Sequence, residues 1–152
     1  MKAAFAKKLI TQDFMDTVSR HKHVIDAMIR PEEDRRLNYW ALRSLLCTCL
    51  LRDGDDLMEQ PQHMWMRAAL HFHQDDMNQV QASYDLMATL KMVPSSTILT
   101  ASGTARAFVG SYCALRMDGL VDHMLSAVGV VASLVRGGSH VGVGMQAVPA
   151  AG

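Results

Sequence analysis

Gln60-Pro61-Gln62-His63-Met64-Trp65-Met66-Arg67 is the stretch that decides the fold of this chain. Pro61 suits the first turn of a helix, because its ring fixes φ and its missing N–H would have no partner there. The pattern therefore predicts a helix over residues 61–73. The order of residue types does not follow from helix propensity or amphipathicity, so we treat the stretch as a specific motif.

Helical patterns precede the motif. Residues 1–30 carry apolar side chains at roughly helical spacing. Pro31 and the acidic residues after it indicate a second helix start, since proline fits the first turn and acids suit the helix dipole. The apolar positions that follow, up to Leu50, predict a further helix that ends at the turn Asp53-Gly54-Asp55-Asp56.

Two more helices are predicted after the motif. Residues 74–93 carry an apolar stripe and end at Pro94, and the Ser/Thr/Gly-rich residues 95–112 predict a loop. A helix is expected over about residues 119–136, ended by the glycines that follow it. Its predicted apolar face consists of Leu120, Met124, Val128, Val131 and Val135.

One strand is predicted near the end of the sequence. Val141, Val143, Met145 and Ala147 alternate with glycine and glutamine, which is a strand pattern. No partner strand is evident, and a single strand cannot satisfy its own backbone groups. We therefore expect it to pair with another chain or with a continuation of this one, or to fray. The strand suggests that the chain is the front part of something larger.

Composition excludes several classes of protein. The chain has 152 residues, enough for one domain with a real core, and its 15 basic and 15 acidic residues cancel, which argues against a nucleic-acid surface. No apolar run approaches the roughly 20 residues that span a bilayer, and the start lacks the apolar centre of a secretory signal. The 3 cysteines make no disulfide framework, so a reducing compartment is expected. The 12 methionines favour flexible core filler over a Met-lined binding groove.

The motif resembles one in the large subunit of class I ribonucleotide reductase, which reads R-P-Q-H-M-x-M-R. Pro61 to Arg67 match it in order with Trp65 at the free position, and Gln60 stands where the family often has arginine. Residues 38–45, Asn-Tyr-Trp-Ala-Leu-Arg-Ser-Leu, are similar to the family's N-Y-F-G-F-K-T-L.

Further matches follow in the same order. Residues 96–104 resemble S-P-T-L-F-N-A-G-T, and residues 111–115 fall where the family has S-S-C-x-L. Residues 142–152 lie over G-V-x-V-x-x-I-R-A-T-G. The resemblance therefore runs from about residue 35 to residue 152.

The resemblance implies a mainly α fold. It would be the helical N-terminal region of the reductase large subunit, with one or two strands belonging to an incomplete α/β ten-stranded barrel. It divides the chain into an unassigned helical lead (1–34), a helical domain (35–112) and the start of the barrel domain (113–152).

The resemblance also implies an activity, the radical reduction of ribonucleoside diphosphates to deoxyribonucleotides for DNA synthesis. Cys113 looks like the redox cysteine on the first barrel strand, and Ser96 like a substrate-contacting serine. Tyr112 replaces another serine that contacts substrate. Asp118 could bind the ribose or base of a nucleotide effector, and Arg136 could lie near its phosphate.

Partners and location follow from the same resemblance. The family uses a radical-generating small subunit and nucleotide effectors, and no cofactor is expected in this chain itself. The expected partners are that small subunit or another large-subunit chain, and a host protein is a further candidate. We expect no nucleic-acid or membrane partner and a cytoplasmic location, in a host cell if the protein is viral.

Departures from the family pattern leave two hypotheses. Tyr112, Thr97, Ser139-His140 and Pro149 replace a serine, a proline, two glycines and an arginine of the family. The remaining catalytic residues of the family would lie beyond residue 152, so the isolated chain is predicted to be inactive. It is either a partial or divergent large subunit, or a non-catalytic viral relic, a pseudoenzyme that binds a protein through the helix at 119–136 and the open strand.

Other candidate sites are weaker. His71 and His73 diverge on a helix without a third ligand, so no metal site is predicted. Asp53 to Asp56 lack the spacing of a calcium loop, which leaves a solvated turn. Without the resemblance, Cys113 is as readily a buried inert cysteine as a reactive thiol.

Overall fold

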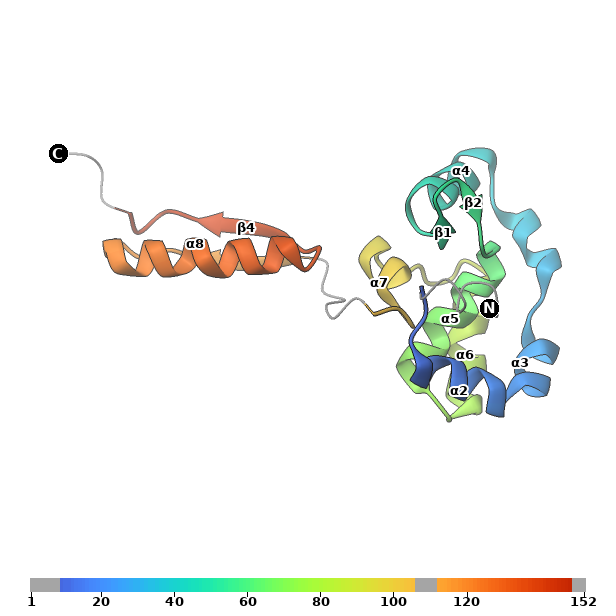
Figure 1. The fold of residues 1–152 in the computed structure, drawn as a ribbon. Coiled ribbons are helices and arrows are strands. Elements are labelled where there is room, and N and C mark those ends of the chain that lie inside the picture. Colours follow the sequence, from blue (N-terminus) through green and yellow to red (C-terminus); the bar gives the residue numbers. More distant parts are fainter. Residues whose placement is uncertain (1–8, 106–111, 149–152) are drawn as a thin grey trace. The chain divides into compact units, whose positions relative to one another are not determined.

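The computed structural model describes residues 9–105 and 112–148. The chain divides into two compact units, residues 1–105 and 106–152 (Figure 1). The described elements are mainly helical, as predicted. The first eight residues of the predicted lead helix and the departure at Pro149 lie outside the described residues, and the three-segment division remains a prediction.

The first unit, which we call the helical unit, contains six α-helices, one 3₁₀-helix and a two-stranded hairpin among its described residues. In chain order these are α2 (Gln12–Arg20), α3 (Lys22–Met28), η1 (Pro31–Arg36), α4 (Tyr39–Thr48), β1 (Arg52–Asp53), β2 (Asp56–Leu57), α5 (Pro61–His73), α6 (Met77–Ala88) and α7 (Ser96–Ala101).

The bounds of α5 confirm the helix predicted over 61–73. The predicted lead helix is divided at His21, and the acidic turn at residues 53–56 joins β1 to β2.

The prediction of a loop over residues 95–112 is wrong at both ends. Residues 96–101 form α7, whose first turn is capped by the Ser95 hydroxyl accepting from the Ile98 N–H at 3.5 Å. Leu99 and Ala101 are buried, so packing against the core overrides the loop-like composition. Tyr112 begins a strand.

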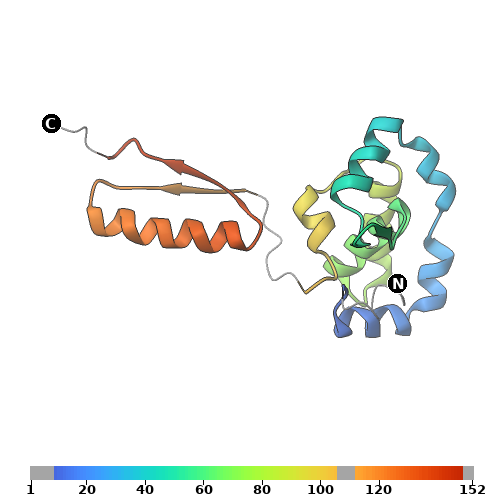
Figure 2. The same cartoon turned by 45° about the horizontal axis from the view of Figure 1, so that its top comes forward.

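Helix α5 is the centre of the helical unit. All of its residues from Met64 to Leu70 are buried, which is the pattern of a helix surrounded by protein on every side. Helix α6 lies beside it in both views (Figures 1 and 2) and buries Val80, Tyr84 and Met87. The lead helices pass around these two and add apolar side chains to the same core. Four methionines are in that core, in agreement with their expected role as filler: Met15, Met64, Met66 and Met87.

The second unit, which we call the strand unit, is a β-α-β arrangement. It consists of β3 (Tyr112–Arg116), α8 (Val121–Arg136) and β4 (His140–Gly144). The strands are parallel and paired from Tyr112 opposite His140 to Arg116 opposite Gly144. Figure 2 shows them side by side with α8 along one face. The expectation that the last strand has no partner in this chain is therefore wrong, because β3 is that partner.

Helix α8 has two apolar faces rather than the single predicted one. Met124, Ala127, Val131 and Leu134 are partly buried at intervals that place them on one side of the helix. A second set is exposed with spacings of four, three, four and three residues, and we call it the outer stripe: Val121, Leu125, Val128, Ala132 and Val135. Val128 and Val135, predicted to share a face with Met124, belong to this exposed stripe at 57% and 55% exposure.

A paired glycine substitution tests the packing at Gly103. Gly103 has a φ of 69°, and a Cβ there would lie 3.0 Å from the Phe14 ring, whereas Gly54 has a φ of 60° with nothing within 4 Å. Gly54→Ala should lower the free energy of unfolding by about 1 kcal/mol, because a residue with a Cβ is strained at positive φ. Gly103→Ala should lower it by about 1 kcal/mol more, because its Cβ would also crowd the Phe14 ring. Urea unfolding of both variants measures the difference. Equal losses would contradict close packing of α2 on this turn.

Candidate functional site

The guanidinium of Arg67, the last residue of the motif, is fully buried in the helical unit. It donates to both Glu59 carboxylate oxygens, from Nε at 3.0 Å and from Nη2 at 2.6 Å. It also donates to the carbonyls of Ser102 at 2.5 Å and Leu99 at 2.8 Å. A buried charge is tolerable only when it is paired and hydrogen-bonded, and here both conditions are met.

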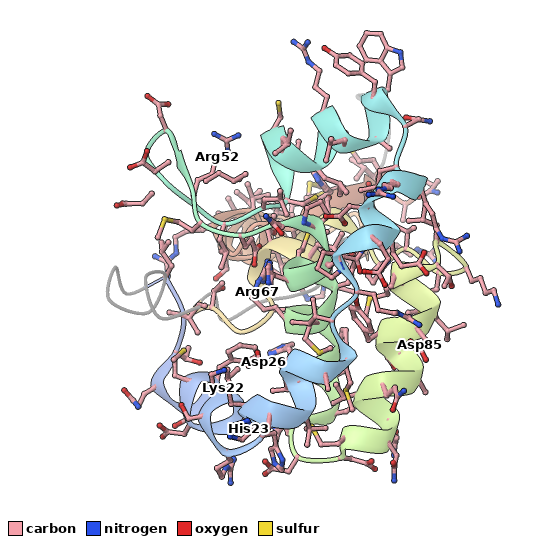
Figure 3. The ribbon with its side chains drawn as sticks, turned by 90° about the vertical axis from the view of Figure 1, so that its right-hand side faces the viewer. Lys22, His23, Asp26, Arg52, Arg67 and Asp85 are labelled. Carbon is pink, nitrogen blue, oxygen red and sulfur yellow. The ribbon has the colours of Figure 1, made fainter. Side chains whose placement is uncertain are left out.

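The same ion pair joins three parts of the chain. Glu59 precedes α5, and its Oε1 accepts from the backbone N–H of Leu51, after α4, at 2.9 Å. The two carbonyls bound by Arg67 belong to the last turn and the C-cap of α7. Figure 3 shows Arg67 amid the helices, while Arg52 lies by the outer hairpin. Arg67 therefore holds the end of α7 against α5.

Ser96, the predicted substrate contact, is the first residue of α7 and is exposed. The helix it begins is anchored at its other end by Arg67, through the carbonyls of Leu99 and Ser102. The Ser102 hydroxyl also donates to the Ile98 carbonyl at 2.7 Å. The position of Ser96 thus depends on a buried contact one helix length away.

A second polar chain fixes the other side of the motif to the lead. The Tyr84 hydroxyl donates to Gln62 Oε1 at 2.8 Å and accepts from the Arg30 N–H at 2.9 Å. Gln62 Nε2 donates to Asp34 at 2.9 Å. Burial raises the pKa of the Asp34 carboxyl, against the opposing effect of the Gln62 hydrogen bond, and burial likewise raises the pKa of Tyr84.

Cys113, the predicted redox cysteine, is the second residue of β3 and is partly buried opposite Val141. Its neighbour Tyr112 stacks on His140, with ring centroids 5.2 Å apart and planes at 27°. Tyr112 and His140 are paired across the two strands. Two departures from the family pattern therefore meet in one contact.

The two predicted effector residues lie at opposite ends of α8. Asp118 follows β3, and its carboxylate is bonded to the His123 ring nitrogen at 2.6 Å and accepts from the Leu120 N–H at 3.4 Å. The hydrogen bond with His123 lowers the pKa of Asp118. Arg136 ends the helix. At about 1.5 Å per residue the two ends of α8 are roughly 22 Å apart, so a single phosphate does not reach both in one strand unit.

Asp118 is at the carboxyl end of the parallel strands, where open α/β sheets usually bind ligands. A cavity of about 490 Å³ lies at this end of the strands and is lined by Leu115, Arg116, Gly144 and Gln146 among others. Arg136 and Cys113 are at the other end of the unit. The structure therefore separates the residues predicted to bind an effector instead of bringing them together.

Within the described parts of the chain, no three side chains of His, Cys, Asp or Glu gather as metal ligands would. His71 and His73 have separate partners: His71 Nδ1 accepts from the Gly103 N–H at 3.3 Å, and His73 Nε2 bonds to the Ser83 hydroxyl at 2.7 Å. None of the helices described here combines the length and the hydropathy of a membrane crossing.

Two residues of this site were not predicted from the sequence. Glu59 carries the carboxylate of the buried pair, and its only local signal is its place just before the motif. The local pattern around His71 suggests only a metal ligand, because its contact with Gly103, 32 residues later, has no local signal.

Removing the buried cation should destabilise the fold strongly. Arg67→Met leaves the Glu59 carboxylate buried and unpaired, which should cost about 3–5 kcal/mol. The matched change Arg52→Met removes an exposed guanidinium that donates to the Leu46 carbonyl at 3.0 Å, and should cost less than about 1 kcal/mol. Chemical unfolding gives both values. The double variant Glu59→Leu/Arg67→Met should recover part of the loss, and equal costs for Arg67 and Arg52 would refute the clamp.

Comparison with known proteins supports the resemblance. Residues 35–107 match the family described as "Ribonucleotide reductase, all-alpha domain". The chain is 28% identical to the ribonucleoside-diphosphate reductase large subunit of Variola virus over 88% of its residues, and 26% identical to the large chain of Schizosaccharomyces pombe over 95%. The large subunit of Arabidopsis thaliana is also 26% identical over 95% of the chain.

The matched part covers 19% of the Variola protein and 18% of each of the other two, so the chain spans about a fifth of the length of these relatives. The relatives include viral, fungal and plant proteins, and a viral origin therefore stays a prediction. The family match and these relatives together show that most of the chain is similar to ribonucleotide reductase large subunits.

Proposed function

We propose that this chain contributes to the reduction of ribonucleoside diphosphates to deoxyribonucleotides, as the all-alpha region and first strands of a reductase large subunit. The observation that carries the proposal is the family match over residues 35–107, which includes the motif and the α7 segment that its arginine holds. The location that goes with this function is the cytoplasm.

On this proposal the helical unit positions the substrate-binding residue Ser96, and the strand unit provides the reactive thiol of Cys113. Ser96 would donate its hydroxyl to a substrate phosphate oxygen, with α7 held in place by Arg67. Cys113 would be one of two thiols that together give two electrons to the substrate and become a disulfide. The radical would come from a small subunit, and nucleotide effectors would bind near Asp118 or Arg136.

The outer stripe of α8 supports an assembly role. Its exposed residues recur with the four-three spacing that lets two helices pack along a seam. Exposed apolar rows of this kind usually mark interaction surfaces. We propose that a second large-subunit chain covers the stripe, with the small subunit or a host protein as the other candidate partners.

A second function is favoured by the contact between Tyr112 and His140. The resemblance implies serine and glycine at these positions, and the stacked rings, with Tyr112 80% exposed, lie on the face of the strands opposite to the Cys113 side chain. A large ring in place of a serine that contacts substrate in the family is poorly suited to substrate binding. The alternative is therefore a non-catalytic protein of the same ancestry that binds a partner through α8 and the strand edges.

A chimera separates the catalytic function from the alternative. Residues 35–148 would replace the matching part of the Vaccinia virus large subunit, a relative 28% identical to this chain. The chimera would be assayed for reduction of cytidine diphosphate with a small subunit and dithiothreitol. If the chain is catalytic in its family context, we expect turnover. Cys113→Ser should abolish this turnover, whereas the control Cys47→Ser should keep it. A folded chimera that has no turnover would support the non-catalytic role if the double change Tyr112→Ser/His140→Gly restores turnover. The unfused chain should show no turnover, and product from it would contradict that expectation.

The assembly role predicts a face-specific effect on self-association. Leu125→Glu places a charge in the outer stripe and should shift the protein to monomer, because a charge in an apolar seam is costly to bury. Val130→Glu changes a residue that is 47% exposed on the opposite side of α8, and should leave association unchanged. Multi-angle light scattering over a concentration series measures both. A wild-type chain that stays monomeric at all concentrations would rule out a second copy as the partner.

A further inference from the structure

Gly103 is the point where the lead helix α2 meets the turn after α7. Its carbonyl accepts from the Thr11 N–H at 3.1 Å, and its N–H donates to His71 Nδ1 at 3.3 Å. The Phe14 ring covers its Cα, since a Cβ built there would lie 3.0 Å from that ring. One glycine thus connects the lead, α5 and the α7 turn.

The hydrogen bond to His71 requires a neutral ring. Because Nδ1 accepts a hydrogen bond from the Gly103 N–H, it carries a lone pair, and the ring proton is on Nε2. In the protonated ring both nitrogens are donors, so Nδ1–H would face the Gly103 N–H. Protonation of His71 therefore turns an attraction into a repulsion at the point where α2 docks.

The surroundings of His71 give protons access to the ring. The ring lines a cavity of about 610 Å³ that is also lined by Asp13, Asp16 and Arg20 of α2. Burial, and then the Arg67 guanidinium, lower the pKa of His71 below its ordinary value of 6.5. The pKa of His71 is lowered although Asp13 and Asp16 line the same cavity, so the ring is neutral at neutral pH.

We propose that His71, Gly103 and Thr11 form a pH-sensitive latch that holds the first turn of α2 on the α7 turn and releases it when His71 is protonated. The latch does not depend on the proposed function, because it follows only from the contacts of Gly103 with His71, Thr11 and Phe14. A fall in pH would thus weaken the attachment of α2 to the turn that follows α7, the helix that begins at Ser96.

The release is expected at only one end of the lead. At the other end of α2, Arg20 and the His21 ring both bind Asp75 Oδ1 at 3.0 Å. These contacts do not involve His71. Acidic pH should therefore loosen residues 11–14 while the end near Arg20 stays attached.

The sign of the pH dependence follows from the lowered pKa. The unfolded or released ring binds a proton more readily than the latched ring, so the contribution of His71 is fully present above about pH 6.5. It is lost progressively as the pH falls from there through the pKa of the latched ring.

Hydrogen exchange with mass spectrometry on the full chain tests the latch. Protection of residues 11–17, corrected for the intrinsic rate at each pH, should fall at least about fivefold between about pH 7.5 and about pH 5. His71→Gln keeps an acceptor without a titrating ring, so its protection should not change with pH. His71→Leu removes the acceptor and should show low protection at both pH values. His73→Gln, in the same helix but away from the lead, should behave as the wild type.

Two results would overturn the latch. One is a fall in protection that persists unchanged in His71→Gln, which would assign the effect to other groups. The other comes from nitrogen NMR of the wild-type chain, which needs no variant: a proton on Nδ1 of His71 at about pH 7.5 is incompatible with the bond from Gly103.

Discussion

The buried ion pair between Arg67 and Glu59 is the constraint on which the helical unit depends. Neither charge is tolerable in the core alone, so the pair requires the groups that complete it: the Leu51 N–H and the carbonyls of Leu99 and Ser102. These partners come from before α5 and from α7. Hydrogen-bond geometry therefore dictates where both segments lie, whereas the apolar contacts of α5 dictate only that they are close.

The sequence predicted the elements whose signals are local. Pro61 marks the first residue of α5, and the spacing around Tyr84 places one face of α6. Helix α7 was missed because it is only six residues long and its buried residues, Leu99 and Ala101, stand among serines and threonines. The pairing of β3 with β4 was missed because a parallel ladder is decided by residues about 28 positions apart, which no local pattern reports.

The candidate site was predictable only where the family motif names its residues. Ser96 and Cys113 were proposed from the resemblance, and the structure places them in different units, which leaves their roles as proposals. Arg67 was part of the motif, yet its clamp on α7 became evident only with the positions of the carbonyls it binds. Glu59 and His71 act through tertiary contacts, so composition and spacing carried no sign of them.

The contact between Tyr112 and His140 changes how the departures from the family pattern should be understood. In the sequence they are separate substitutions, 28 positions apart, each adding bulk where the family has a small residue. In the structure they are paired across two parallel strands and their rings stack. Each ring buries part of the other, so reverting one alone would expose apolar surface on its partner. They are better treated as one structural change on the exposed face of the two strands, opposite to the face of Cys113.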